Sequence, residues 1–190
     1  MANEDTLSDV RGATRDTARP LQSLLRGEKR TAGTLFQGVA NTDTKQLLIE
    51  NNTADKFLLL FEPTVRSSGQ YYARKRKNVT VDTAGADAPL INPKTDDATP
   101  LAVSVTTAGD GETGAISGGT DYPQLTAGSG SNPNNASPGE SGATGISDAV
   151  APGDTLAVEA QNQSGGTQDI SIIAEFLAVP ESVVDPERLR

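Results

Sequence analysis

The chain has 190 residues and a formal net charge of −9, and it contains no histidine, no cysteine, no tryptophan and one methionine. Histidine is the usual acid–base group near neutral pH, and cysteine is the strongest ordinary nucleophile and a soft metal ligand. Their absence excludes Ser-His triads, thiol catalysis and structural zinc sites, so we expect no catalytic residue, no metal ligand and no cofactor.

Charge is divided unevenly along the chain. Residues 1–77 carry 13 cations and 9 anions, whereas residues 78–190 carry 3 cations and 16 anions. This split favours one region that packs on an acidic neighbour and another that faces solvent, or two segments built differently. The acid excess, scarce lysine and abundant Asp, Thr, Gly and Ala resemble the composition of proteins from salt-loving organisms, with an ordinary acidic protein as the alternative.

Residues 1–32 are expected to form an N-terminal docking arm. Their apolar residues have roughly helical spacing, and Pro20 divides the pattern into two short helices. These apolar residues are Leu7, Val10, Ala13, Leu21, Leu24 and Leu25. The arm is too poor in apolar residues to fold alone, so it is expected to order on a partner, or else to remain a floppy tail. It lacks the apolar stretch of a secretory signal, and no apolar run reaches membrane-spanning length, so no membrane insertion is expected.

From residue 33 the pattern changes to short apolar or alternating runs between turn residues, which predicts β-strands. The expected strands are 33–40, 45–51, 56–62, 69–74, 78–82, 101–107, 155–160 and 168–179. The last two are expected to pair as an antiparallel hairpin. Residues 108–153 are rich in Gly, Ser, Asn, Ala and Pro, which predicts a long exposed loop excursion with at most one small hairpin.

Eight or so strands with short turns and almost no helix predict an all-β fold. We expect an antiparallel β-sandwich, jelly-roll-like, with a barrel as the alternative. The predicted domain covers 33–179. The partly helical N-terminal arm, the long Gly/Ser/Asn-rich loop and a charged C-terminal tail at 180–190 are additions to it.

The basic run at residues 74–77, Arg-Lys-Arg-Lys, is the most distinctive local feature of the sequence. With Arg66 it lies in a stretch free of acidic residues, beside Tyr71 and Tyr72. The candidate interface residues are Arg66, Arg74, Lys75, Arg76 and Lys77, together with Leu7, Val10, Leu21, Leu24 and Leu25 of the arm. Four consecutive cations point to both faces of a strand, so the run predicts a solvated strand end or an interface with acidic partner proteins. Nucleic acid is the weakest alternative, because the chain as a whole is acidic.

Carboxylate pairs occur at Asp96-Asp97 and at Asp110-Gly111-Glu112. Paired carboxylates can hydrolyse glycosides or bind a hard cation. Neither pair matches a calcium-loop pattern, and the chain has only seven aromatic residues for a sugar platform. Solvated acidic loops are therefore the preferred interpretation, ahead of a structural cation site and of catalysis.

Five features follow one another between residues 33 and 179: a G-x-x-F strand, an N-x-T turn, an apolar strand, a P-G turn before an alternating strand, and an acidic–aromatic pair. They are Gly33–Phe36, Asn51–Thr53, Phe57–Leu60, Val150–Val158 and Glu175–Phe176. This order resembles that of small β-sandwich virion proteins of tailed viruses, which decorate heads or tails as turrets, fibres or spikes. With the acidic composition, the resemblance extends to a tailed virus of a halophilic archaeon.

The resemblance implies a non-enzymatic virion structural protein, a capsid- or tail-attached decoration, turret or fibre subunit. Its expected partners are other virion proteins and further copies of itself in a homo-oligomer, with the host cell surface as an additional contact and no nucleic acid. The alternative is an extracellular or cell-surface β-sandwich binding module of a halophile. A hydrolase that uses Asp96 or Asp110 has the least support.

Overall fold

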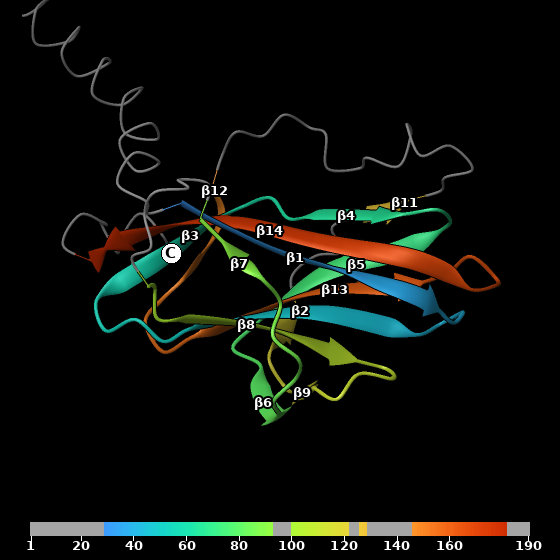
Figure 1. Cartoon of the computed structure of the whole chain (residues 1–190), viewed down its shortest axis with the longest axis horizontal. Helices are drawn as coiled ribbons and strands as arrows, with labels where there is room; N and C mark the ends of the chain where they lie inside the picture. Colours follow the sequence, from blue (N-terminus) through green and yellow to red (C-terminus); the bar gives the residue numbers. More distant parts are fainter. Residues whose placement is uncertain (1–28, 93–99, 122–125, 129–145, 182–190) are drawn as a thin grey trace, which may run out of the picture.

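The computed structural model describes residues 29–92, 100–121, 126–128 and 146–181, and these contain fourteen strands and no α-helix (Figure 1). The longer strands are β1 (Lys29–Val39), β2 (Thr44–Asn51), β3 (Lys56–Phe61), β5 (Tyr71–Lys77), β8 (Val103–Gly109), β13 (Thr155–Asn162) and β14 (Gln168–Pro180). The shorter ones are β4 (Thr64–Ser67), β6 (Thr80–Thr83), β7 (Leu90–Ile91), β9 (Ala115–Ser117), β10 (Thr120–Asp121), β11 (Thr126–Gly128) and β12 (Ile146–Val150).

The strands form two six-stranded antiparallel sheets and one small two-stranded sheet. Sheet A has the order β12-β3-β14-β1-β7, with β4 also beside β14, and sheet B has the order β10-β5-β13-β2-β8, with β11 also beside β5. Figure 1 shows β14 and β1 in one layer and β13 and β2 in the other, with the small β6–β9 sheet projecting below the second layer. The predicted all-β antiparallel sandwich is confirmed.

Strand pairing is nested from the ends of the chain inward. The first described strand, β1, pairs with the last described strand, β14, and β2 pairs with β13. Further inward, β3 pairs with β12, and β5 pairs with β10 and β11. A long antiparallel hairpin rolled into two sheets gives this order, which is that of a jelly roll. The segment that includes β6, β7, β8 and β9 is an insertion between the inner strands of this roll.

The main core lies between the two sheets. Inward-facing residues of β14 alternate with outward-facing ones, and Ile170, Ile172 and Phe176 have no exposed surface. They meet Leu156 and Val158 from β13 of the opposite sheet. Burying a side chain of this size stabilises a fold by about 1.5–3 kcal/mol. Sheet B carries a second, small apolar cluster on its outer face, where Leu48, Val79 and Ala157 are covered with help from Val81 and Ile116 of the β6–β9 sheet.

Two buried asparagines turn the chain from sheet B into sheet A. Asn51 ends β2, and its side-chain amide donates to the carbonyls of Lys56 (2.8 Å) and Val150 (2.9 Å) while its oxygen accepts from the backbone N–H of Thr53. Asn162 ends β13 at the opposite end of the sheet and donates to Val39 (2.8 Å), while its oxygen accepts from Ser164. Both corners have the sequence N-x-S/T. In each, the asparagine side chain supplies hydrogen bonds to the backbone where the pairing between strands ends.

Several sequence expectations need correction. The last two strands do not form a hairpin, because β13 lies in sheet B and β14 in sheet A. Alternation identifies the buried face of a strand but not its neighbour, and the Asn162 corner carries the chain across the sandwich. The expected loop excursion 108–153 holds β9, β10, β11 and β12, and β4 was not predicted.

The boundary of the arm is also different. Strand β1 begins at Lys29, with Arg30 and Ala32 buried, so residues 29–32 belong to the sandwich and not to a docking arm. The remaining arm residues, including Leu7, Val10, Leu21, Leu24 and Leu25, lie outside the described residues, as do most residues of the C-terminal tail.

Candidate functional site: the outer face of sheet B

The basic run occupies β5, a strand that is paired on both sides. Its burial alternates, so Tyr71, Ala73 and Lys75 point inward while Tyr72 and Arg74 lie on the outer face of sheet B. Strand β13 lies on one side of β5, and β10 and β11 lie on the other. The run does lie at the end of β5, but only Arg74 of its four cations is exposed, so the strand end is not freely solvated.

Glu159 of β13 is the centre of an ion cluster on this face. Its carboxylate is 1% exposed and accepts hydrogen bonds from Arg74 Nε, from Arg76 Nη1 (2.8 Å) and from Gln46 Nε2 (2.7 Å). Asp121 completes the cluster at 3.2 Å from Arg74 and 3.3 Å from Arg76. The hydrogen bond to Glu159 raises the pKa of Arg74 further above its ordinary value. A buried carboxylate is tolerated here because two guanidinium groups and an amide compensate it.

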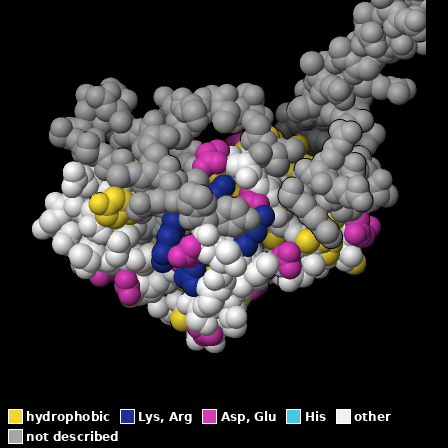
Figure 2. Space-filling view, turned by 180° about the vertical axis from the view of Figure 1, so that it is seen from behind, with side chains coloured by type: hydrophobic (Ala, Val, Ile, Leu, Met, Phe, Trp, Pro, Cys, Tyr) yellow, Lys and Arg dark blue, Asp and Glu magenta, His cyan; other side chains and the backbone are white. Residues whose placement is uncertain are grey.

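The other two cations of the run also have acidic partners within the chain. Lys75, buried between the sheets, lies 3.7 Å from Glu62, and Lys77 pairs with the buried carboxylate of Asp148. The lysine and arginine side chains near the middle of the face in Figure 2 accordingly have acidic side chains beside them. Arg66 is not part of this group, since it is exposed on β4 of sheet A. The fold thus supplies intramolecular acids to a run that was predicted to meet acids on other proteins.

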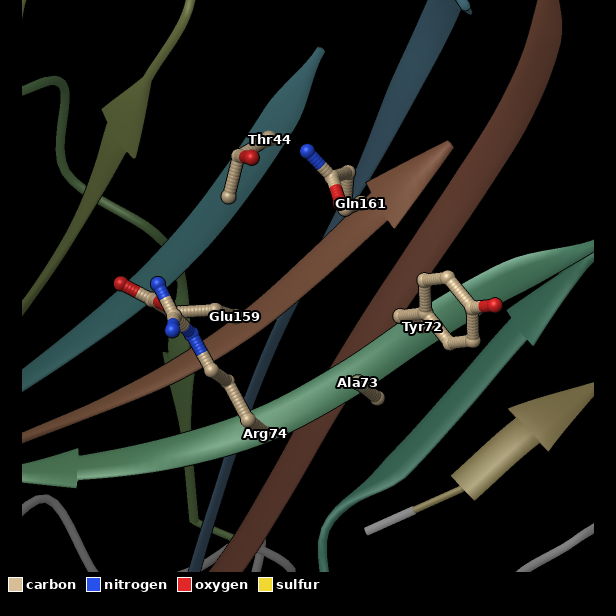
Figure 3. Close-up of a pocket in the computed structure, with 6 residues that line it drawn as sticks. All are labelled: Thr44, Tyr72, Ala73, Arg74, Glu159 and Gln161. Atoms are coloured by element: carbon tan, nitrogen blue, oxygen red, sulfur yellow. The ribbon is translucent and has the colours of Figure 1, made fainter. Parts of the chain in front are cut away.

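A groove of about 280 Å³ lies beside the ion cluster (Figure 3). Its residues come from three neighbouring strands: Thr44 from β2, Gln161 and Glu159 from β13, and Tyr72, Ala73 and Arg74 from β5. The register places Gln161 opposite both Tyr72 and Thr44, so the three side chains form one row across the sheet. A second hollow of about 360 Å³ shares Thr44 and Arg74 and extends toward Asp110 and Gly114. The outer face of sheet B is therefore hollowed and polar, and it lies above a rigid floor of paired strands.

The predicted carboxylate pairs have structural roles where they can be placed. Asp110 accepts a hydrogen bond from the backbone N–H of Thr44 (2.8 Å), and Glu112 forms an ion pair with Lys45 (2.7 Å). Among the described residues, no three acidic side chains converge as they would to hold a metal ion. Asp96 and Asp97 lie outside the described residues.

Sheet A presents an open edge at β1. Strand β7 pairs only with Thr31 and Ala32, so within the described part of the chain no strand covers the same side of β1 from Gly33 to Phe36. Leu35 on this edge is 56% exposed and Ile91 of β7 is 59% exposed. Beyond Phe36 the register shifts at a bulge, with Gly38 at φ 62°. An uncovered strand edge with exposed apolar side chains is a template for pairing with another chain.

No protein family, curated protein or solved structure is significantly similar to this chain. Among the described residues there is no helix with the length and apolar character needed to cross a membrane.

Sequence reasoning missed Glu159, Gln161 and Tyr72 as one site. A carboxylate within a predicted strand was the available signal, because an acid at Glu159 on a sheet face requires a cation on the adjacent strand. The basic run supplied such cations, but only the register shows that Arg74 lies opposite Glu159.

Proposed function

We propose that this chain is a non-enzymatic virion structural protein, a capsid- or tail-attached subunit that assembles with further copies of itself. The observation that carries the proposal is the open edge of β1, where Leu35 and Ile91 are exposed although the sandwich already has a complete core between its sheets. A second copy can add a strand to this edge and bury both side chains.

Two further observations are compatible with assembly through the β1 edge. Jelly-roll sandwiches recur in viral capsid proteins and in lectins, so the fold is compatible with the proposal. The basic run is neutralised within the chain by Glu62, Asp121, Asp148 and Glu159, so the subunit would not depend on an acidic partner to cover these cations. Apolar strand addition is then the main contact of the interface.

The alternative, a cell-surface binding module, predicts a monomer that binds a soluble ligand. Light scattering of the purified full-length chain, in low and in molar salt, separates the two functions. A virion subunit is expected to form an oligomer of uniform mass, and the double variant Leu35→Asp/Ile91→Asp is expected to weaken association at least tenfold. Thr83→Ala, exposed on the β6–β9 sheet, is the control. A wild-type monomer at every concentration would contradict self-assembly through this edge.

A further inference from the structure

The groove on the outer face of sheet B has hydrogen-bonding groups that no atom of the described residues uses. Among the described residues, the hydroxyls of Thr44 and Tyr72 have no hydrogen-bond partner, although both line the groove. Arg74 uses Nε and Nη1 in its ion pairs, and its Nη2 has no hydrogen-bond partner in the part of the chain that the structure describes. Donors and acceptors left open in a hollow are the groups with which a protein orients a small ligand.

The remaining polar side chains of the groove are held in place. Gln161 donates from Nε2 to the carbonyl of Thr42 (2.9 Å) and accepts from Gln163 (2.8 Å). The guanidinium of Arg74 is fixed between Glu159 and Asp121. Because these groups are already ordered by the protein, a ligand would lose little affinity to ordering them.

Charge at the groove is balanced. Arg74 and Arg76 face the two carboxylates of Glu159 and Asp121, so the cluster has no net charge. An anion such as phosphate would have to compete with carboxylates that already occupy the guanidinium groups. The charge balance therefore favours an uncharged polar ligand.

Tyr72 adds an aromatic surface to this polar row. Its side chain is 42% exposed, and Figure 3 shows the ring face-on above β5, with its hydroxyl directed away from Arg74 and Glu159. A ring of this kind offers an apolar face beside a polar edge. The axial C–H groups of a sugar ring match such a face, and the sugar hydroxyls match Thr44, Gln161 and Arg74.

We propose that the groove formed by Thr44, Tyr72, Arg74 and Gln161 binds a neutral saccharide. Its volume, about 280 Å³, is near the lower end for small-ligand sites and suits one or two sugar rings. The inference goes beyond the proposed function and does not depend on assembly, because the groove lies on sheet B and the open edge belongs to sheet A. In an assembled particle, sheet A would then dock on neighbouring subunits and sheet B would contact a glycan.

The test is an NMR titration of the full-length ¹⁵N-labelled chain with the methyl glycosides of galactose, glucose, mannose and N-acetylglucosamine. Concentrations up to about 20 mM are needed, because a ligand of one ring with few contacts binds in the millimolar range. At least one glycoside is expected to shift the amide signals of β5 and β13 near Tyr72 and Gln161. Galacturonate and inorganic phosphate are the charged comparisons.

Tyr72→Ala is expected to weaken binding at least tenfold, and Tyr72→Phe is expected to retain most of it. Thr44→Val removes a hydroxyl without a protein partner, so it should weaken binding even if Tyr72→Ala fails to fold. Arg66→Ala, an exposed position on sheet A, is the control and should bind as wild type. Failure of all four glycosides to shift these amides, shifts that persist in both Tyr72→Ala and Thr44→Val, or binding of the charged compounds alone would overturn the proposal.

The source of the saccharide is distinguished by a second arm. Labelled protein is applied to immobilised cell-surface oligosaccharides, with the active methyl glycoside as competitor. Capture that the glycoside displaces assigns the groove to surface glycans. Binding of the free glycoside without capture assigns it to a soluble sugar and agrees with the same chemistry.

Discussion

Glu159 lies directly opposite Arg74 in the pairing of β13 with β5, and its carboxylate, 1% exposed, also accepts a hydrogen bond from Arg76. One buried acid thus binds two cations of the basic run, Arg74 and Arg76, on the outer face of sheet B. Removal of the acid leaves the two guanidinium groups with only the exposed carboxylate of Asp121, whereas removal of one cation leaves the other paired with Glu159.

Glu159→Gln is therefore expected to destabilise the fold by about 3 kcal/mol, at the low end for breaking a buried pair because the Arg74 side chain is 46% exposed. Arg74→Ala is expected to cost less, since Arg76 continues to compensate the carboxylate. Urea unfolding measures both changes, with Arg66→Ala as the exposed control. A smaller loss for Glu159→Gln than for Arg74→Ala would refute this assignment of the central group.

Tyr71 provides a prediction about alkaline pH. Its hydroxyl donates to the carbonyl of Val65 (3.0 Å), and burial raises the pKa of the phenol above its ordinary value near 10. The folded state therefore holds this proton more tightly than the unfolded state, and the contribution of Tyr71 is full below about pH 10 and falls as pH rises beyond it. Tyr71→Phe is expected to cost about 1 kcal/mol at neutral pH.

The wild-type chain and Tyr71→Phe should approach each other in stability above about pH 10. Urea unfolding of both proteins at about pH 8 and about pH 11 measures the change. Lysines also titrate in this range, but they are present in both proteins and therefore cancel in the difference. A difference that stays constant over this range would show that Tyr71 does not titrate as described.

The backbone segments beside the β6–β9 sheet pass close to Thr107 of β8, and this close packing requires glycine at two positions. A Cβ at Gly85 would overlap the carbonyl oxygen of Thr107, and a Cβ at Gly114 would meet the same oxygen. Gly85→Ala is expected to cost about 2 kcal/mol, within the range for overpacking, and to release Val81 and Ile116 from the small apolar cluster. Gly166→Ala is the matched control, because a Cβ there meets nothing within 4 Å. Equal thermal midpoints for the two variants would contradict this account.

Salt should stabilise the chain. A net charge of −9 produces self-repulsion, and the screening length falls from about 10 Å at 0.1 M salt to about 3 Å at 1 M. The buried pair at Glu159 is screened much less than exposed charges, so the net effect of KCl is expected to be a higher thermal midpoint. Calorimetry across this range tests the resemblance to halophilic proteins, and a midpoint that falls with KCl would count against it.

Local pattern predicted most of the strands but not their partners. Alternation at 155–160 and 168–179 identified β13 and β14 correctly, because one face of each is buried in the core. Which strands become neighbours depends on the corners, and the N-x-S/T tripeptides at Asn51 and Asn162 were the local signal for crossing between sheets. Short strands such as β4 and β10 carry too few residues to show a period.

The candidate site was harder to predict for the same reason. The basic run was visible in the sequence, but three of its acids lie far along the chain at Asp121, Asp148 and Glu159, and only the fold brings them together. The groove depends on register, since Tyr72, Gln161 and Thr44 form a row only when three strands align.

The nested pairing also constrains how the chain can be made. Thr31 lies opposite Glu175, 144 residues later, and β13 and β14, both paired on each side, are synthesised after all the other described strands. Neither sheet can be completed on the ribosome until β13 and β14 have emerged, so the strands that precede them remain unpaired on one side until then. Folding dominated by such distant contacts takes milliseconds to seconds, and we expect stopped-flow refolding in that range and a need for chaperones during production.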